Sequence, residues 1–152
     1  MTTVARPQGC TNFKLRQLMR RVARHYDAEL ARAGLKTTQY SLLTHVLHLG
    51  PLRPVDLARA MGLTPSTLSR NLQPMVAAGW LEMAEGSDAR SWLVGITPAG
   101  REKRATAQRR WRAAQEGLNA LLGTERVAAL HALIDDSLGL LGGDEDEGEH
   151  DE

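Results

Sequence analysis

The chain has 152 residues, a length that suits one domain with a hydrophobic core of its own. Hydrophobic residues make up 42% of it and charged residues 24%, which predicts a soluble globular protein, and no apolar run approaches the roughly 18 residues of a membrane span. The one cysteine, Cys10, excludes an internal disulfide, and the N-terminus lacks the apolar core of a signal peptide, so we expect a cytoplasmic protein.

The formal net charge of +1 conceals a strong asymmetry along the chain. Residues 143–152, GDEDEGEHDE, contain seven of the 18 acidic residues and no Lys or Arg. All 19 Lys and Arg residues lie in residues 1–142, which contain the other 11 acidic residues, so this part of the chain carries a net charge of +8. A basic body of this kind suits a polyanionic partner.

Two helices are predicted in the first third of the chain. Apolar residues recur every three or four positions from Asn12 to Ala33, which predicts a long helix that Gly34 ends. A second helix is predicted from Thr38 to Leu49, with Thr37 as its N-cap.

Two shorter helices joined by a tight turn are predicted at Pro54–Met61 and Pro65–Ala78. Gly62 ends the first of them, and Thr64 caps the second, in which Pro65 occupies the first position, where a missing N–H costs nothing. The inward positions of the second helix are Leu68, Leu72, Met75 and Val76. A helix-turn-helix of this kind is typical of proteins that bind duplex DNA.

The second of these short helices has the features of a recognition helix, whose N-terminal part faces the base edges of the major groove. Its outward polar residues are Ser66, Thr67, Ser69, Arg70, Asn71 and Gln73. Arg70 can bind both acceptors of guanine, Asn71 can pair with adenine, and the hydroxyls can hold phosphates. An ordinary solvated helix face is the alternative interpretation.

A hairpin follows, with strands predicted at Trp80–Met83 and Trp92–Ile96 around the loop Glu85–Arg90. Arg90 can enter the minor groove from the tip of such a wing, because negative potential is concentrated there. Asp88 is expected to orient the guanidinium of Arg90 rather than to touch DNA. The alternative is an ordinary ion pair within the loop.

Two more helices complete the chain, from Pro98, with Thr97 as N-cap, to Leu122 and from Glu125 to Leu141. The first helix and these last two are too long for the small central module to cover their apolar stripes, so we expect a second copy of the chain to bury them. The predicted fold is mainly α with a small β-wing (α+β). Its parts are a flexible N-terminus (1–9), a dimerisation helix (10–36), a winged helix-turn-helix DNA-binding lobe (37–100), two dimerisation helices (101–142) and an acidic disordered tail (143–152).

Two segments of the sequence are specific enough to indicate a protein family. They are the run PVDLARAMGLTPSTLSRNLQPMVAAGWLE and the wing pattern Asp88-x-Arg90-x-x-Leu93-x-x-Ile96-Thr97-x-x-Gly100. Both resemble the DNA-binding lobe of the MarR family, the multiple antibiotic resistance regulators, and the order of helices matches over residues 10–141. The resemblance implies a homodimer in the bacterial or archaeal cytoplasm, associated with the nucleoid, that binds pseudo-palindromic operators in double-stranded DNA and represses transcription.

Members of this family commonly respond to a small aromatic or phenolic effector bound between the dimer helices and the DNA-binding lobe. The residues that could line such a crevice here are Arg16, Arg20, His25, His45 and Trp111. Each of them has an alternative interpretation as a surface charge, a helix-packing residue or a core aromatic residue.

An oxidant-sensing regulator of the same fold is a further alternative. Cys10 lies near the start of the first helix, where a helix N-terminus can activate a thiol, and Tyr26 and Tyr40 resemble the tyrosines of the peroxide-sensing branch of the family. An alignment through Tyr26, however, puts the sensing position at Asn12, two residues beyond Cys10. An inert thiol is therefore the preferred interpretation.

Other classes of function find little support. His45 and His48 lie three apart without a matching carboxylate or cysteine cluster, and Gly95-x-x-x-x-Gly100 lacks the lysine of a phosphate-binding loop. We therefore expect no enzymatic activity, metal or cofactor. A winged helix used only for contacts with other proteins would not need the net positive charge of residues 1–142.

The acidic tail, residues 143–152, has two interpretations. It either solubilises the protein or mimics DNA on the basic face.

Overall fold

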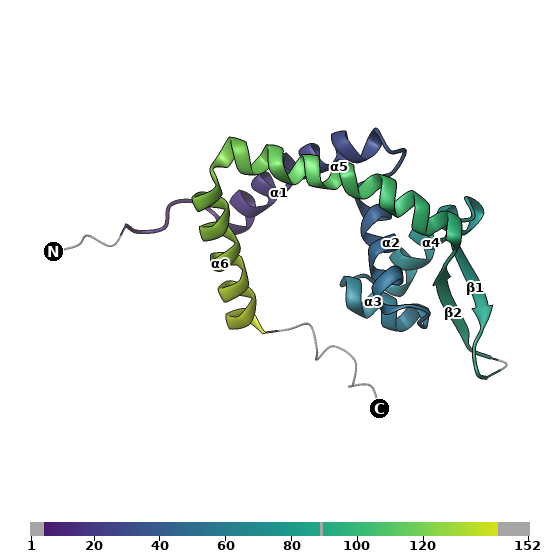
Figure 1. Cartoon of the computed structure of the whole chain (residues 1–152). Helices are drawn as coiled ribbons and strands as arrows, with labels where there is room; N and C mark the ends of the chain where they lie inside the picture. Colours follow the sequence, from purple (N-terminus) through teal and green to yellow (C-terminus); the bar gives the residue numbers. More distant parts are fainter. Residues whose placement is uncertain (1–4, 89, 143–152) are drawn as a thin grey trace, which may run out of the picture.

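The computed structural model describes residues 5–88 and 90–142. Its elements, labelled in Figure 1, follow the predicted order. They are α1 (Thr11–Ala31), α2 (Thr37–Leu49), α3 (Pro54–Met61), α4 (Pro65–Ala77), β1 (Leu81–Glu85), β2 (Trp92–Ile96), α5 (Pro98–Leu122) and α6 (Thr124–Leu141). The prediction of a mainly helical winged helix-turn-helix fold is confirmed, whereas the flexibility expected for residues 1–4 and the disorder expected for 143–152 concern residues outside this description.

Helix α5 links the two halves of the chain (Figure 1). Its N-terminal half packs on α2, and it also contacts α1 and α6. The compact lobe of α2, α3, α4 and the hairpin lies at one end of α5, and α6 turns back at the other end on the same side of α5. No helix in the described ranges is both long and apolar enough to cross a membrane.

The hydrophobic core lies in the lobe and joins all of its elements to the end of α1. Its largest fully buried side chains are Leu30, Leu42, Leu43, Val46, Leu57, Leu68, Met75, Leu81 and Val94. Burial of one such side chain contributes about 1.5–3 kcal/mol. Val76, predicted to face inward, is 37% exposed instead, because Met75 takes the inward position after Leu72.

Two predicted helix caps are confirmed and one is wrong. Oγ1 of Thr64 accepts the N–H of Thr67 at 3.3 Å, and Oγ1 of Thr97 accepts the N–H of Gly100 at 3.0 Å. Thr37, however, is the first residue of α2 rather than its N-cap, which is Lys36. The Thr37 hydroxyl donates to Oδ1 of Asp27 at 2.5 Å and so ties the start of α2 to α1.

The hairpin is antiparallel, and Leu81 pairs with Ile96 while Glu85 pairs with Trp92. Its first strand begins one residue later than predicted, because the N–H of Trp80 bonds to the carbonyl of Met75 and so belongs to the turn that leaves α4. The carbonyl of Trp80 accepts hydrogen bonds from both the N–H and the hydroxyl of Thr97. The hairpin is therefore fixed at its base to the end of α4 and the start of α5.

Large apolar side chains remain exposed outside the lobe. On α1, α5 and α6 they include Phe13, Leu15, Met19, Leu121, Leu133, Ile134, Leu138, Leu140 and Leu141. Several of these belong to the stripes that the sequence assigns to an interface, and within one copy of the chain only Val127 of α6 is buried. A single copy of the chain therefore leaves these apolar side chains of α1, α5 and α6 exposed to solvent.

Candidate nucleic-acid interface

Helix α4 is held by one face and presents the other to solvent. Leu68, Leu72 and Met75 are buried at spacings of four and three residues, and Gly62, at φ 64°, adopts the left-handed conformation that the tight turn from α3 requires. This packing fixes the orientation of α4 against the core. The outward side of its first two turns is therefore a rigid polar surface.

The structure brings the six recognition-helix residues of the sequence analysis together on this surface. Ser66, Ser69, Arg70 and Gln73 are exposed, while Thr67 and Asn71 are partly buried. Oγ1 of Thr64 donates to Oγ1 of Thr67 at 2.9 Å, so the Thr67 hydroxyl takes part in the cap of its own helix. No carboxylate of the described residues forms an ion pair with Arg70, whose guanidinium is available to a partner.

The wing loop is closed by its own hydrogen bonds. The N–H of Gly86 donates to the carbonyl of Ser91 at 2.8 Å, and the N–H of Ser91 donates to the carbonyl of Asp88 at 3.0 Å. Oδ1 of Asp88 accepts the backbone N–H of Arg90 at 3.2 Å. Asp88 thus shapes the loop through the backbone, whereas the sequence analysis expected it to orient the Arg90 guanidinium. Among the residues described, no ion pair joins these two side chains.

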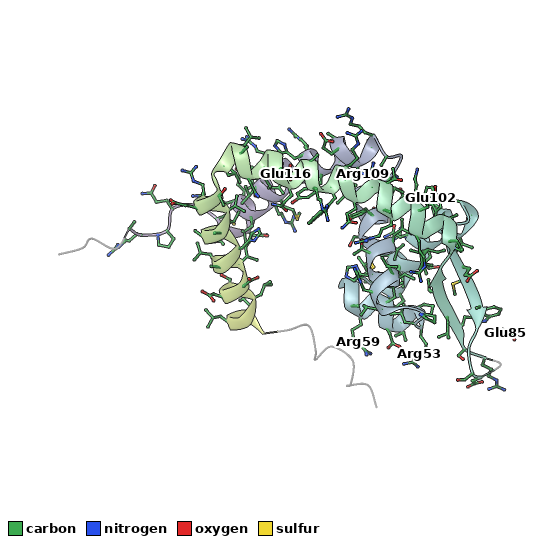
Figure 2. The ribbon with its side chains drawn as sticks, viewed as in Figure 1. Arg53, Arg59, Glu85, Glu102, Arg109 and Glu116 are labelled. Atoms are coloured by element: carbon green, nitrogen blue, oxygen red, sulfur yellow. The ribbon has the colours of Figure 1, made fainter. Side chains whose placement is uncertain are left out.

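Two arginines that were overlooked in the sequence, Arg53 at the N-cap of α3 and Arg59 in its last turn, lie on the same side of the lobe as the wing loop (Figure 2). Arg53 donates from Nε to Oδ2 of Asp56 at 3.0 Å, and a nitrogen of Arg59 lies 3.9 Å from Oδ1 of the same carboxylate. The hydrogen bond to Asp56 raises the pKa of Arg53 above its ordinary value. One carboxylate therefore serves two permanent cations, and this surface keeps a positive charge.

The five residues predicted for an effector site do not meet in one place. His45 and Trp111 line a cavity of about 490 Å³ between α1, α2 and α5. His25 lines a separate hollow of about 640 Å³ with Arg21 and Arg24. Arg16 and Arg20 are exposed on α1 and line neither space.

The cavity beside α2 contains residues that the sequence pattern did not single out. The ring of Tyr40 stacks on that of Trp111, with centroids 6.4 Å apart, and the guanidinium carbon of Arg104 lies 5.8 Å from the Tyr40 ring centroid. Nδ1 of His45 lies 2.7 Å from the carbonyl oxygen of Ser41, and since a carbonyl can only accept, Nδ1 is the donor of this hydrogen bond. The cavity thus combines an aromatic wall with one cation.

Cys10 is exposed at the N-cap position of α1. Tyr26 lies 16 residues further along the chain. At 1.5 Å per residue the helix separates the two by about 24 Å, so the thiol cannot contact Tyr26 of the same chain. Within the described ranges, no three metal-ligating side chains gather at one place.

Comparison with known proteins connects this geometry to a family. A family model described as MarR family matches residues 33–91. The uncharacterized HTH-type transcriptional regulator YwoH of Bacillus subtilis is 24% identical over 90 residues, which cover 59% of this chain and 66% of the relative. The multiple antibiotic resistance protein MarR of Salmonella typhimurium is 27% identical over 95 residues, which cover 62% of this chain and 64% of the relative. The matches therefore span slightly less than two thirds of these relatives.

Solved structures share the fold over nearly the whole chain. A mutant MarR from E. coli complexed with operator DNA superposes with a TM-score of 0.78 at 21% identity, covering 84% of this chain and 92% of that one. The M. tuberculosis regulator MosR in complex with DNA gives a TM-score of 0.68 at 28% identity, covering 85% of this chain and 98% of that one. Residues 33–91 thus match the MarR family model, and most of the chain shares its winged helix-turn-helix fold with the solved structures of MarR and MosR.

Proposed function

We propose that the chain works as a homodimeric repressor that binds a pseudo-palindromic operator in duplex DNA and is released by a small aromatic or phenolic effector. The observation that supports duplex binding most strongly is the shared orientation of cationic side chains from separate elements. Arg53 and Arg59 beside α3 lie on the same side of the lobe as the wing loop that carries Arg90.

In this proposal α4 enters the major groove, where Arg70 and Asn71 contact base edges and the hydroxyls of Ser66 and Ser69 contact phosphates. Thr67 and Gln73 flank these contacts. Arg90 enters the adjacent minor groove from the wing, and Asp88 holds the loop in shape for it. Arg53 and Arg59 contact the phosphates on either side of the groove.

The exposed apolar side chains of α1 and α6 support the dimer. Leu138 is 62% exposed and Leu141 is 84% exposed. A groove of about 390 Å³ between α1, α5 and α6 is lined mainly by apolar residues, and a second copy would cover both features. Two-fold symmetry would present two α4 helices to successive major grooves, about 34–36 Å apart.

The cavity beside α2 supports release by an effector. Its volume of about 490 Å³ lies within the 300–1,000 Å³ typical of small-molecule sites. An aromatic acid would stack on the Tyr40–Trp111 wall and pair its carboxylate with Arg104. Because α2 belongs to the lobe whereas α1 and α5 belong to the dimer part, a ligand between them would shift one against the other and change the spacing of the two α4 helices.

Selection from random duplexes, followed by footprinting, tests the proposal. We expect an enriched site with two inverted half-sites about 10 base pairs apart, bound by two copies of the chain as measured by sedimentation. Enrichment of no sequence, or of a single half-site bound by a monomer, would exclude the proposed function. Conversion of Leu138 to Glu is expected to abolish dimers and operator binding together.

A further inference from the structure

We propose that the acidic segment 143–152 binds to the cationic surface of the DNA-binding lobe and competes with duplex DNA for it. We use the name cationic lobe surface for four exposed arginines of the DNA-binding lobe, Arg53, Arg59, Arg70 and Arg90. The inference rests on the proposed function in one respect only, because it takes this surface to be the one that DNA would occupy.

Charge complementarity is the first argument. The acidic segment holds seven carboxylates within ten residues and no Lys or Arg, while the remainder of the chain carries a net charge of +8. A run of carboxylates of this density resembles the phosphate backbone in sign and spacing of charge, since duplex DNA presents one charge per about 1.7 Å of its axis. The segment therefore suits the same kind of surface as DNA.

The cationic lobe surface is largely uncompensated. Asp56 is the carboxylate within ion-pair distance of Arg53 and Arg59, and in the described part of the chain neither Arg70 nor Arg90 forms an ion pair. The side chains of Arg53 and Arg59 are 60% and 78% exposed. Four guanidinium groups thus face solvent, while Asp56 is shared by two of them and Asp88 accepts the backbone N–H of Arg90.

The position of α6 places the end of the described chain on the lobe's side of α5. Helix α6 turns back at the end of α5 and ends at Leu141 on the same side of α5 as the lobe (Figure 1). Ten residues can extend over at most about 33–36 Å. A tethered segment whose length matches the span to its binding surface reaches an effective concentration in the millimolar range, at which even weak ionic contacts would be populated.

Docking of this kind has a definite thermodynamic consequence. Cations already neutralised by the segment have released their counterions before DNA arrives, so DNA binding releases fewer ions. The intact chain would bind duplex DNA more weakly at low salt and with a shallower dependence on salt than a chain with a neutral segment. Screening would remove the difference at high salt.

The first experiment compares the intact chain with a neutral-segment variant of equal length. Its substitutions are Asp144→Asn, Glu145→Gln, Asp146→Asn, Glu147→Gln, Glu149→Gln, Asp151→Asn and Glu152→Gln. A chain with the segment in reversed order, which preserves every charge, is the matched control. We expect the neutral-segment variant to bind a duplex about tenfold more tightly at ~50 mM salt and less than about twofold more tightly at ~300 mM, whereas the reversed segment behaves as the intact one. Equal affinities at low salt would overturn the inference.

The second experiment needs no DNA and so separates docking from the proposed function. A nitroxide attached through Gly148→Cys, in a Cys10→Ser background, retains all seven carboxylates. We expect it to broaden the Nε–H signals of the cationic lobe surface at low salt and to leave them sharp at high salt. Broadening confined to the arginines of α1, or none at all, would overturn the inference. If docking is seen but neither the intact nor the neutral-segment chain binds duplex DNA, both the proposed function and the competition fail.

Discussion

The hydroxyl of Tyr26 donates a hydrogen bond to Oε1 of Gln115 at 2.5 Å and joins α1 to α5 between two cavities. Tyr26 lines both the cavity beside α2 and the apolar groove between α1, α5 and α6. Nε2 of Gln115 in turn donates to Oδ1 of Asn119 at 3.0 Å. The proposed effector site and the proposed dimer surface therefore share one wall, so a ligand that displaces Tyr26 would act on both.

Replacement of Tyr26 with Phe is expected to lower the free energy of unfolding by about 1 kcal/mol, because it removes a hydrogen bond in a partly buried position and leaves Gln115 without this donor. Urea unfolding followed by circular dichroism measures the change. Tyr40→Phe is the control, since the Tyr40 hydroxyl forms no hydrogen bond with the described residues. Equal losses for the two variants would show that the Tyr26 contact contributes nothing specific.

The difference in stability between the parent and Tyr26→Phe is expected to depend on pH. Burial raises the pKa of Tyr26 above its ordinary value of 10.0 and so favours the neutral phenol in the folded chain. Above pH 10 the folded chain then holds more protons than the unfolded one, and the free energy of unfolding falls as the pH rises. The stability advantage of the parent over Tyr26→Phe should therefore shrink between pH 8 and pH 11. If the stability difference between the parent and Tyr26→Phe stayed constant or grew with pH, burial would not raise the pKa of Tyr26.

Two glycines of α5 are expected to respond oppositely to alanine. A Cβ at Gly100 would clash with the carbonyl oxygen of Trp80, whereas a Cβ at Gly117 would meet no atom within 4 Å. Gly100→Ala should thus separate the start of α5 from the base of the wing, at a cost of about 2 kcal/mol or more, while Gly117→Ala should stabilise the helix by up to about 1 kcal/mol. Thermal and urea unfolding of the two variants measure both effects. A Gly100→Ala protein as stable as its parent would refute the close approach.

The two proposed groove residues should differ in their effects on DNA. Arg70→Ala is expected to relax base preference at one position of each half-site, at a cost of about 1–3 kcal/mol on the preferred duplex. Arg90→Ala is expected to weaken binding to most duplexes with less change in preference. Competition binding against a library of single-base variants measures both. An unchanged base preference in Arg70→Ala would mean that α4 does not read the sequence.

Arg104 is expected to hold the carboxylate of an aromatic acid. Salicylate should raise the melting temperature of the intact chain and release it from a selected duplex, and Arg104→Gln should lose most of both effects. Arg101→Gln, an exposed position on the same helix, should behave as the parent. If Arg104→Gln and Arg101→Gln responded equally to salicylate, Arg104 would not be part of the binding site.

The features that the sequence predicts well are those determined by neighbouring residues. Thr64 and Thr97 cap the helices that follow them, because each bonds to an N–H three residues on. The apolar spacing of Leu68, Leu72 and Met75 likewise determines which face of α4 remains free. The exposed face of α4 could therefore be predicted from local patterns, whereas Arg53 and Arg59 could not.

The features that the sequence predicts poorly depend on contacts between distant segments. Thr37 bonds to Asp27 of another helix instead of capping its own. The cavity beside α2 is formed where α2 meets α1 and α5, so a periodic pattern within α1 could not show that Arg16 and Arg20 do not line it. Arg104 was overlooked for the same reason, since only tertiary packing brings it to Tyr40.

The salt dependence of duplex binding tests the proposed DNA-binding function most directly. About ten phosphate contacts per dimer would give a plot of log affinity against log salt with a slope near −9 for the neutral-segment variant, and a somewhat shallower slope for the intact chain. The measurement is a fluorescence titration of a selected duplex at salt concentrations from about 50 to 300 mM. A steep negative slope is the predicted result. A slope close to zero for both proteins would contradict binding through the arginines of the lobe.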